Sequence, residues 1–445
     1  MPAPDPAALD AARDLCRFID ASPSPYHCVA TAIERLREAG FAPAGSGAAP
    51  PAPAAGYYAS RGGTLVAWRA PAGFDRFLVV GAHTDSPNLR VKPRPDHGKA
   101  GYRQLGVEVY GGALLNSWLD RDLGLCGRVA VRGRGLALVR IDRPVLRIPQ
   151  LAIHLDREIN EKGLLLNRQQ HLSPFWALAS SGDGAEDDPT FRAVLAGEVG
   201  CASEDVLSWE IMVHPLQAST LGGLADEFVN APRIDNQLSC WAGVEALCGR
   251  ARSSGDDDSP AHAEVLVLFD HEEVGSTSDR GADGAFLASL LERVSAAAGL
   301  DRVAHLEALA RSHCVSSDCA HATNPNYADR HEPEHTIALN AGPVLKLNAN
   351  LRYATDAASS APVVAAAERA GVPLQWFVNR TDLACGSTIG PLTAAALGVA
   401  TIDVGAPQLA MHSSRELCGS ADPAMLRDLL ASYWTGRDSG EEWLT

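Results

Sequence analysis

Residues 263–276 read AEVLVLFDHEEVGS and place two adjacent carboxylates, Glu272 and Glu273, just after an apolar run that ends at Phe269. An apolar run of this length, ending in charges and Gly275, is typical of a buried parallel strand whose carboxyl end opens into a loop. Ligands bind at that edge of open α/β sheets. Adjacent side chains point in different directions, so one acid can hold a cation while the other moves a proton. The alternative is a solvated acidic loop.

The length and composition favour a globular protein with two domains. The chain has 445 residues, which exceeds the usual size of a single hydrophobic core. No apolar run approaches the roughly 20 residues that span a bilayer, and the N-terminus lacks the basic start and apolar core of a signal peptide. The ten cysteines are scattered without a CxxC pair. These features predict reduced thiols and a cytoplasmic location.

The charge balance limits the partners that the sequence allows. A net charge of -16 argues against nucleic acid or an anionic membrane, because both require a positive face. An acidic substrate would need basic residues gathered locally. Lysine is rare among the 38 basic residues and occurs only at Lys92, Lys99, Lys162 and Lys346.

The distribution of patterns along the chain predicts an α/β fold with an insertion. Helical spacing over 4–21 and 28–41 precedes an expected strand near 74–83. Between about 100 and 230 the texture changes to β segments separated by Gly and Arg-Gly turns. We expect a discontinuous mixed-sheet domain of residues 1–95 and 230–445, interrupted by a β-rich domain of residues 96–229. Polar or Pro/Gly-rich loops are expected at 44–56, 180–190 and 252–262.

Four further segments place metal-type ligands at the ends of predicted elements. His83 and Asp85 follow an apolar strand, and their spacing points both side chains the same way in extended chain. The carboxylate can then orient a ligand histidine, although an HxD pair is common by chance. Asp235 stands just before a helical stretch, where an ordinary N-cap is the alternative.

Asp318 and His412 complete the set. Asp318 follows a short apolar segment, and a turn-stabilising aspartate is the alternative. His412 follows a strand and a proline-containing loop, where the alternative is an incidental histidine before a helix capped by Ser413 or Ser414. Two histidines and several carboxylates favour a pair of Zn²⁺, Co²⁺ or Mn²⁺ ions over thiolate-bound metals. One remaining acid is what a metal-activated water needs as its general base.

Seven motifs follow one another along the chain. They are SPSPYH at 22–27, GAHTDSPNLRVKP at 81–93, IDNQ at 234–237, FDHEEVGS at 269–276, SSDCAHATNP at 316–325, GPVLKLNAN at 342–350 and MHSSRE at 411–416. In this order, from about residue 17 to the C-terminus, the chain resembles the M18 aminopeptidases, the aspartyl aminopeptidase family. No position that the family's chemistry requires is substituted.

The resemblance implies a dizinc exopeptidase catalytic domain with an inserted oligomerisation domain. It places one zinc on His83 and Asp318, the other on His412 and Glu273, and makes Asp235 the bridge between them. Co²⁺ or Mn²⁺ are conceivable substitutes. Glu272 would be the general base, and Asp85 would orient His83. The expected activity is zinc-dependent removal of the N-terminal residue of peptides with a free amine.

The resemblance also suggests how substrates are recognised. M18 enzymes typically prefer N-terminal Asp or Glu, which requires a cation in this acidic chain. Lys346, followed by Arg352 and Tyr353, is the candidate for carboxylate recognition, and a surface lysine is the alternative. His154, in IPQLAIHLDR, is expected to complete the pocket of a neighbouring subunit, with a structural histidine as the alternative. Family members form dodecameric shells, so we expect a homo-oligomer built from dimers.

Three rival functions remain at this point. M42-type aminopeptidases with neutral specificity and M20-type carboxypeptidases or deacylases share the ligand pattern. A non-catalytic, metal-stabilised shell or cargo-binding protein would need the ligands but not a spare base. Glu272 beside Glu273 favours an enzyme over the last of these.

Overall fold

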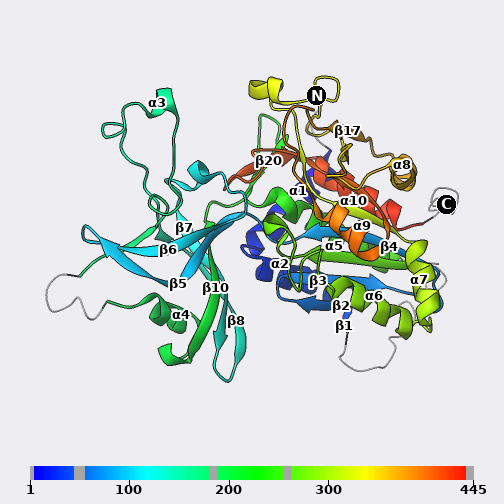
Figure 1. The fold of residues 1–445 in the computed structure, drawn as a ribbon, viewed down its shortest axis with the longest axis horizontal. Helices are drawn as coiled ribbons and strands as arrows, with labels where there is room; N and C mark the ends of the chain where they lie inside the picture. The colour runs from blue at the N-terminus through cyan, green and yellow to red at the C-terminus, as the bar shows by residue number, and fades with distance from the viewer. Residues whose placement is uncertain (1–4, 45–55, 181–187, 254–261, 437–445) are drawn as a thin grey trace. The chain divides into compact units, whose positions relative to one another are not determined.

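The structure is a computed structural model that describes residues 5–44, 56–180, 188–253 and 262–436. Most of each predicted loop, namely residues 45–55, 181–187 and 254–261, therefore lies outside the described residues. The chain forms two compact units (Figure 1). The first unit contains Met1–Asp85, Ser219–Met411 and Glu416–Thr445, and the second contains Ser86–Ala218 and His412–Arg415.

A nine-stranded mixed sheet organises the first unit. β13 pairs in parallel with β4 and antiparallel with β3, so the predicted parallel strand before Glu272 is confirmed within a mixed sheet. The strands follow the order β1-β2-β3-β13-β4-β14-β18-β16-β17. Their bounds are β1 Ala42–Pro43, β2 Gly56–Arg61, β3 Thr64–Arg69, β4 Phe77–His83, β13 Ala263–Phe269, β14 His313–Ser317, β16 Val344–Leu347, β17 Gln375–Val378 and β18 Ala400–Gly405.

Helices cover both faces of this sheet, which explains why β4 and β13 are buried at every residue. In β13, Leu266 and Leu268 join a core with α1, α2, α5, α8 and α10, whereas Val265 and Val267 join a core with α6, α7 and α9. A strand buried on both faces loses the alternation of polar and apolar residues. The helices are α1 Pro6–Ala21, α2 Pro25–Glu38, α5 Ile234–Ser253, α6 Phe286–Ala297, α7 Arg302–Ala310, α8 Ala357–Ala370, α9 Ile389–Leu397 and α10 Asp422–Tyr433.

A smaller five-stranded sheet in the first unit follows the order β11-β12-β20-β19-β15. It contains the strand that the sequence interpretation missed: the chain after His412 forms β20, not a helix capped by Ser413 or Ser414. Ser414 instead donates its hydroxyl to the carbonyl of Ser117 at 2.6 Å. The strands are β11 Thr220–Gly222, β12 Phe228–Ala231, β15 Ala320–His321, β19 Pro407–Leu409 and β20 Glu416–Gly419.

The second unit is β-rich. Its six strands pair antiparallel in the order β8-β7-β10-β5-β6-β9, and α4, Phe191–Val199, packs on the core of this sheet. The long connection from β8 to β9 contains only the short helix α3, Ile159–Lys162. The strands are β5 Asn88–Lys99, β6 Tyr102–Tyr110, β7 Leu123–Val131, β8 Gly135–Leu146, β9 Phe175–Leu178 and β10 Val206–Pro215.

Among the described residues, none of the helices combines the length and apolar character that crossing a membrane requires.

Candidate active site

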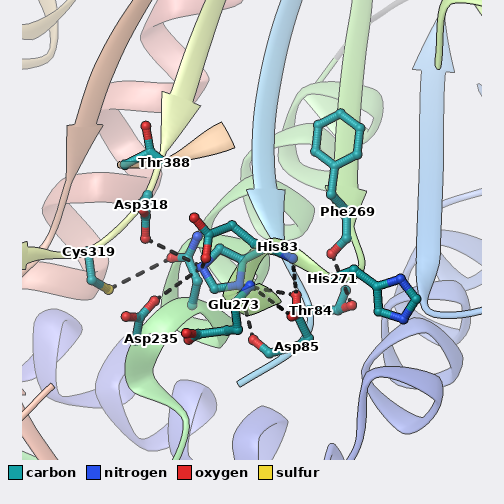
Figure 2. Close-up of polar contacts among 12 residues, drawn as sticks. His83, Thr84, Asp85, Asp235, Phe269, His271, Glu273, Asp318, Cys319 and Thr388 are labelled. Atoms are coloured by element: carbon teal, nitrogen blue, oxygen red, sulfur yellow. Dashed lines mark hydrogen bonds and ion pairs between the residues drawn. The ribbon is translucent and has the colours of Figure 1, made fainter. Parts of the chain in front are cut away.

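The carboxyl ends of three neighbouring strands bring the predicted residues of the first unit together. His83 is the last residue of β4 and is paired with Phe269, the last residue of β13. β14 lies on the other side of β4 and is followed directly by Asp318. Figure 2 shows His83 at the centre of this edge, with Asp85, Asp235, Glu273 and Asp318 around it.

His83 is buried among carboxylates. Its Nε2 atom lies 3.3 Å from Asp235 Oδ1, 3.5 Å from Asp318 Oδ1 and 3.9 Å from Glu272 Oε2. Burial lowers the pKa of His83, but its contacts with the Asp235, Asp318 and Asp85 carboxylates more than compensate and hold the pKa well above its usual range. The site therefore favours positive charge at the imidazole.

The other nitrogen of His83 is fixed by Asp85. His83 Nδ1 lies 3.0 Å from the backbone carbonyl oxygen of Asp85 and 3.5 Å from its carboxylate. Because a carbonyl oxygen can only accept, Nδ1 carries the proton, and in the neutral ring Nε2 is left with the lone pair. The orientation predicted for His83 thus comes chiefly from the main chain of Asp85.

The carboxylate of Asp85 holds the turn that presents the two glutamates. The backbone amides of Glu272 and Glu273 each donate to it at 3.1 Å. The two residues open a single 3₁₀ turn, Glu272–Val274, between His271 and Gly275, both of which have left-handed backbone angles. Asp85 therefore connects the end of β4 to the turn after β13, a role that the sequence prediction did not include.

Burial and like charges disfavour ionisation of both glutamates. Burial, together with the charges of Asp318, Asp85 and Asp235, raises the pKa of Glu272 to about 8, although His83 opposes this. The pKa of Glu273 is raised well above its usual range by burial and then by Asp235 and Glu272. A bound cation would oppose both shifts, because its positive charge favours the ionised carboxylates.

Asp235 lies in the first turn of α5, where its backbone angles are not helical. Its backbone amide donates to Glu416 Oε2 at 3.0 Å. Next to it, the Asn236 side chain donates to the carbonyl of Ser317 at 2.8 Å. Glu416 thus helps to position Asp235. The sequence interpretation quoted Glu416 within MHSSRE but gave it no role.

Within the first unit, two sets of donor atoms have the spacing that a metal ion requires. The ligand atoms of His83, Asp235 and Asp318 all lie within 4.8 Å of one another, as do those of His83, Glu272 and Glu273. Imidazole nitrogen and carboxylate oxygen are ligands that zinc accepts. The residues present therefore fit a zinc centre.

The candidate substrate residues of the first unit differ in burial and in their distance from this cluster. Lys346 is buried in β16, so the alternative of a surface lysine is wrong. Its ammonium lies 3.6 Å from Asp318 Oδ2, donates to the carbonyl of Cys319 at 3.2 Å and sits 5.1 Å from the ring centre of Tyr353. Tyr353 is also buried, whereas Arg352 is exposed and donates to the carbonyl of Gly386 at 3.3 Å.

His154 and His412 belong to the second unit. His154 is exposed in the connection between β8 and β9, outside any helix or strand. His412 directly follows Met411, the last residue of the first unit's middle segment. Its Nδ1 atom lies 3.2 Å from the carbonyl oxygen of Gly112, which leaves Nε2 as the ring's acceptor when the ring is neutral.

Comparison with known proteins gives a consistent result. Residues 18–434 match the family model described as aminopeptidase I zinc metalloprotease (M18). A probable M18 family aminopeptidase 2 from Streptomyces avermitilis is 50% identical over 426 residues, which cover 95% of this chain and 97% of the relative. A probable M18 family aminopeptidase 2 from Mycobacterium leprae is 49% identical over 95% of this chain and 98% of its own length.

Solved structures share the fold. Ape4, solved by cryo-electron microscopy in complex with Nbr1, is 35% identical with a TM-score of 0.90, and the match covers 98% of this chain and 88% of Ape4. The mApe1 dodecamer of S. cerevisiae is 28% identical with a TM-score of 0.81, over 96% of this chain and 98% of its subunit. The family model matches nearly the whole chain, and the relatives are about 50% identical in sequence. This chain therefore belongs to the M18 family of zinc metallo-aminopeptidases.

Proposed function

We propose that this M18 aminopeptidase removes N-terminal Asp or Glu from peptides, using two zinc ions and Glu272 as the general base. The crowding of acids at the strand edge carries this proposal. The carboxylates of Asp85, Asp235, Glu272, Glu273 and Asp318 interact with one another or with His83, and Lys346 contacts only the last of them among the contacts described. When His83 is neutral and binds metal, five ionised acids against one lysine leave four negative charges, which two divalent cations balance.

The proposed ligand sets follow the geometry in the first unit and the motif order at His412. His83 and Asp318 would hold one ion, Glu273 and His412 the other, and Asp235 would bridge them. When bound, the two ions would polarise the scissile carbonyl, lower the pKa of the attacking water and hold the substrate's free amine. In both histidines a backbone carbonyl engages Nδ1, so both rings can offer Nε2.

Glu272 would move the proton. Its carboxylate lies on the turn that Asp85 holds, close to His83 but on a different residue from the ligand Glu273. As a base, Glu272 would take a proton from the attacking water and return it to the leaving amine. The neighbouring acids that raise its pKa make it a better base, provided that cations neutralise enough of their charge to leave it ionised.

The deciding experiment measures amino-acid release from a panel of peptides that differ only in the N-terminal residue. We expect turnover that requires zinc, needs a free N-terminal amine and is fastest for Asp or Glu. Glu272→Gln should bind zinc and fail to turn over. No metal-dependent turnover on any peptide would contradict the proposal and would favour a metal-stabilised shell protein.

Lys346 is proposed to recognise the substrate carboxylate, with Tyr353 and Arg352 beside it. The buried ammonium supports this role because burial strengthens its attraction for a second carboxylate. The test compares Asp-, Glu- and Leu-anilide hydrolysis by the wild type and Lys346→Ala. A selective loss on the acidic substrates is expected. Equal losses on all three would instead show that Lys346 only holds Asp318.

His154 is proposed to complete the substrate pocket of a neighbouring subunit in a dodecamer built from dimers, with the second unit forming the contacts between subunits. Two observations support the proposal: the exposure of His154 and the dodecameric assembly of mApe1. Mixing His154→Ala subunits with Glu272→Gln subunits should restore part of the activity, because some sites then receive both intact residues. Verified mixed oligomers without any rescue would contradict the role in trans.

A further inference from the structure

Asp403 is a buried acid that the chemistry described above does not use. It lies in the interior of β18 and is fully buried. The sequence TIDVG gives little sign of it, since a single aspartate in an apolar strand can equally be an edge residue. A carboxylate in such a position needs hydrogen-bond donors from its surroundings.

Three donors from three separate segments converge on the Asp403 carboxylate. Oδ1 accepts from Ser316 Oγ at 2.7 Å and from Thr388 Oγ1 at 2.5 Å. Oδ2 accepts from the backbone amide of Ala354 at 2.6 Å. The carboxylate thus fastens β14, the chain before α8 and the start of α9 to β18.

Each of these segments leads directly to the candidate site. Ser316 is paired with Asp403 across β14 and β18, and the next hydrogen bond along these strands joins the Asp318 amide to the Val404 carbonyl at 3.0 Å. Ala354 follows Tyr353, whose ring faces the Lys346 ammonium. The network therefore reaches both the proposed zinc ligand Asp318 and the proposed substrate pocket.

The third segment extends the same arrangement. The hydroxyl of Thr388 accepts from the Gly390 amide at 3.2 Å and so caps α9. A methyl group at Gly390 would lie 2.4 Å from an Asp403 oxygen, so only glycine allows α9 to begin this close to the carboxylate. The neighbouring Ser387 hydroxyl donates to the Arg352 carbonyl at 3.1 Å, which connects the loop before α9 to the residue that precedes Tyr353.

We propose that Asp403 is a positioning residue that sets the preference for the substrate side chain. It would do so by fixing the relative positions of Asp318, the Lys346–Tyr353 pair and the start of α9. This inference rests on the proposed function of the site. Burial raises the pKa of Asp403 and the charge of Lys346 opposes this rise, while the same ammonium lies 3.6 Å from Asp318 Oδ2.

The test measures kcat/KM for Asp- and Leu-anilides and takes their ratio as the readout. Asp403→Asn replaces one accepting oxygen by an NH₂ group. Either the Ala354 amide loses its acceptor at Oδ2, or the Ser316 and Thr388 hydroxyls lose theirs at Oδ1. We expect the ratio to change by about tenfold while zinc content stays at the wild-type level. Asp422→Asn is the matched control, because Asp422 is a buried acid that accepts from the Asn340 and Gly342 amides, away from the cluster.

A second pair of variants decides the matter if Asp403→Asn does not fold. Thr388→Val removes one donor to Asp403, and Thr388→Ser restores the hydroxyl. Thr393→Val removes a buried hydroxyl from the same helix and serves as the control. The ratio should shift in Thr388→Val, return in Thr388→Ser and stay unchanged in Thr393→Val.

The outcomes separate this inference from the proposed function. A wild type without metal-dependent turnover contradicts the function itself. An active wild type whose ratio survives both Asp403→Asn and Thr388→Val contradicts only the role of Asp403. An equal shift of the ratio in Asp422→Asn also overturns it, because any buried acid would then have the same effect.

Discussion

Two regions of the first unit bury carboxylates in opposite ways. At the edge of β4, β13 and β14, acids face one another around His83, and like charges add to burial in raising the pKa of Glu272 and Glu273. At the start of α10, Asp422 is alone among backbone amide donors, and burial raises its pKa to about 7 against the opposing effect of those hydrogen bonds. Amide donors make a single acid tolerable, whereas a group of acids needs a cation.

The largest expected effect separates the two adjacent glutamates. Glu272→Gln should lower kcat by about 10² to 10⁴-fold, the usual contribution of a general base, and should keep its zinc. Glu273→Gln should lose one zinc per subunit because it removes a ligand. Peptide hydrolysis and metal analysis of both variants, with Glu307→Gln as an exposed control on α7, test this division. Equal zinc loss in both variants would show that the residues share one role.

Metal removal should expose the repulsion within the cluster. In the metal-free protein, the folded state holds protons at His83, Glu272 and Glu273 that the unfolded state releases, so stability falls as pH rises from about 4.5 to about 8. Zinc at about 1,000 times its Kd adds about 4 kcal/mol. The gap in Tm between zinc-loaded and chelator-treated protein should therefore widen from pH 5 to pH 8 in thermal unfolding. A constant gap would contradict the charge argument.

A smaller effect is expected one step away from the ligands. Glu416→Gln keeps a carbonyl oxygen for the Asp235 amide but loses the negative charge. We expect zinc affinity to fall about 10-fold to 100-fold, as for other residues that orient a ligand, with the folded structure retained. Competition with a chromogenic chelator measures the change. Wild-type affinity in this variant would show that the Asp235 turn holds itself in place.

The smallest effect is expected for Asp422, the single buried acid at the start of α10. Its raised pKa means that the folded state binds a proton that the unfolded state releases, so its contribution to stability is lost as pH rises from about 4 to about 7. Asp422→Asn should flatten this part of the Tm–pH curve while leaving peptide hydrolysis unchanged. A variant whose Tm falls as steeply as that of the wild type would show that other groups cause the slope.

Much of the fold could be predicted because each pattern had a local cause. The apolar run of β13 reports burial on two faces, and the Pro- and Ser-rich break before α2 supplies its cap, Ser24, whose hydroxyl accepts from the His27 amide. The strand β20 was mistaken for a helix start because Ser413 and Ser414 look like caps. Its pairing with β12, almost 190 residues earlier in the chain, has no local signal.

The residues of the site likewise divide into those that the sequence could predict and those that it could not. His83, Glu272, Glu273 and Asp318 could be named because each stands at the end of a strand, where sequence patterns predict a ligand edge. Asp403, Glu416 and the carbonyl of Asp85 could not, since their roles depend on which distant amide or hydroxyl meets them. The burial of Lys346 was likewise hidden, because nothing in GPVLKLNAN separates a paired lysine from a surface one.

The strand order also bears on how the enzyme is made. β13 lies between β3 and β4, yet the ribosome completes it only after the long segment of the second unit, Ser86–Ala218, and β18 follows later still. At about 5–20 residues per second, roughly 10 to 40 s pass between the synthesis of His83 and that of Phe269. Until then the nascent chain has the histidine without Glu272 or Glu273. With the roles proposed for Glu272 and Glu273, the growing chain would therefore have no peptidase activity until the strand that precedes them has been made.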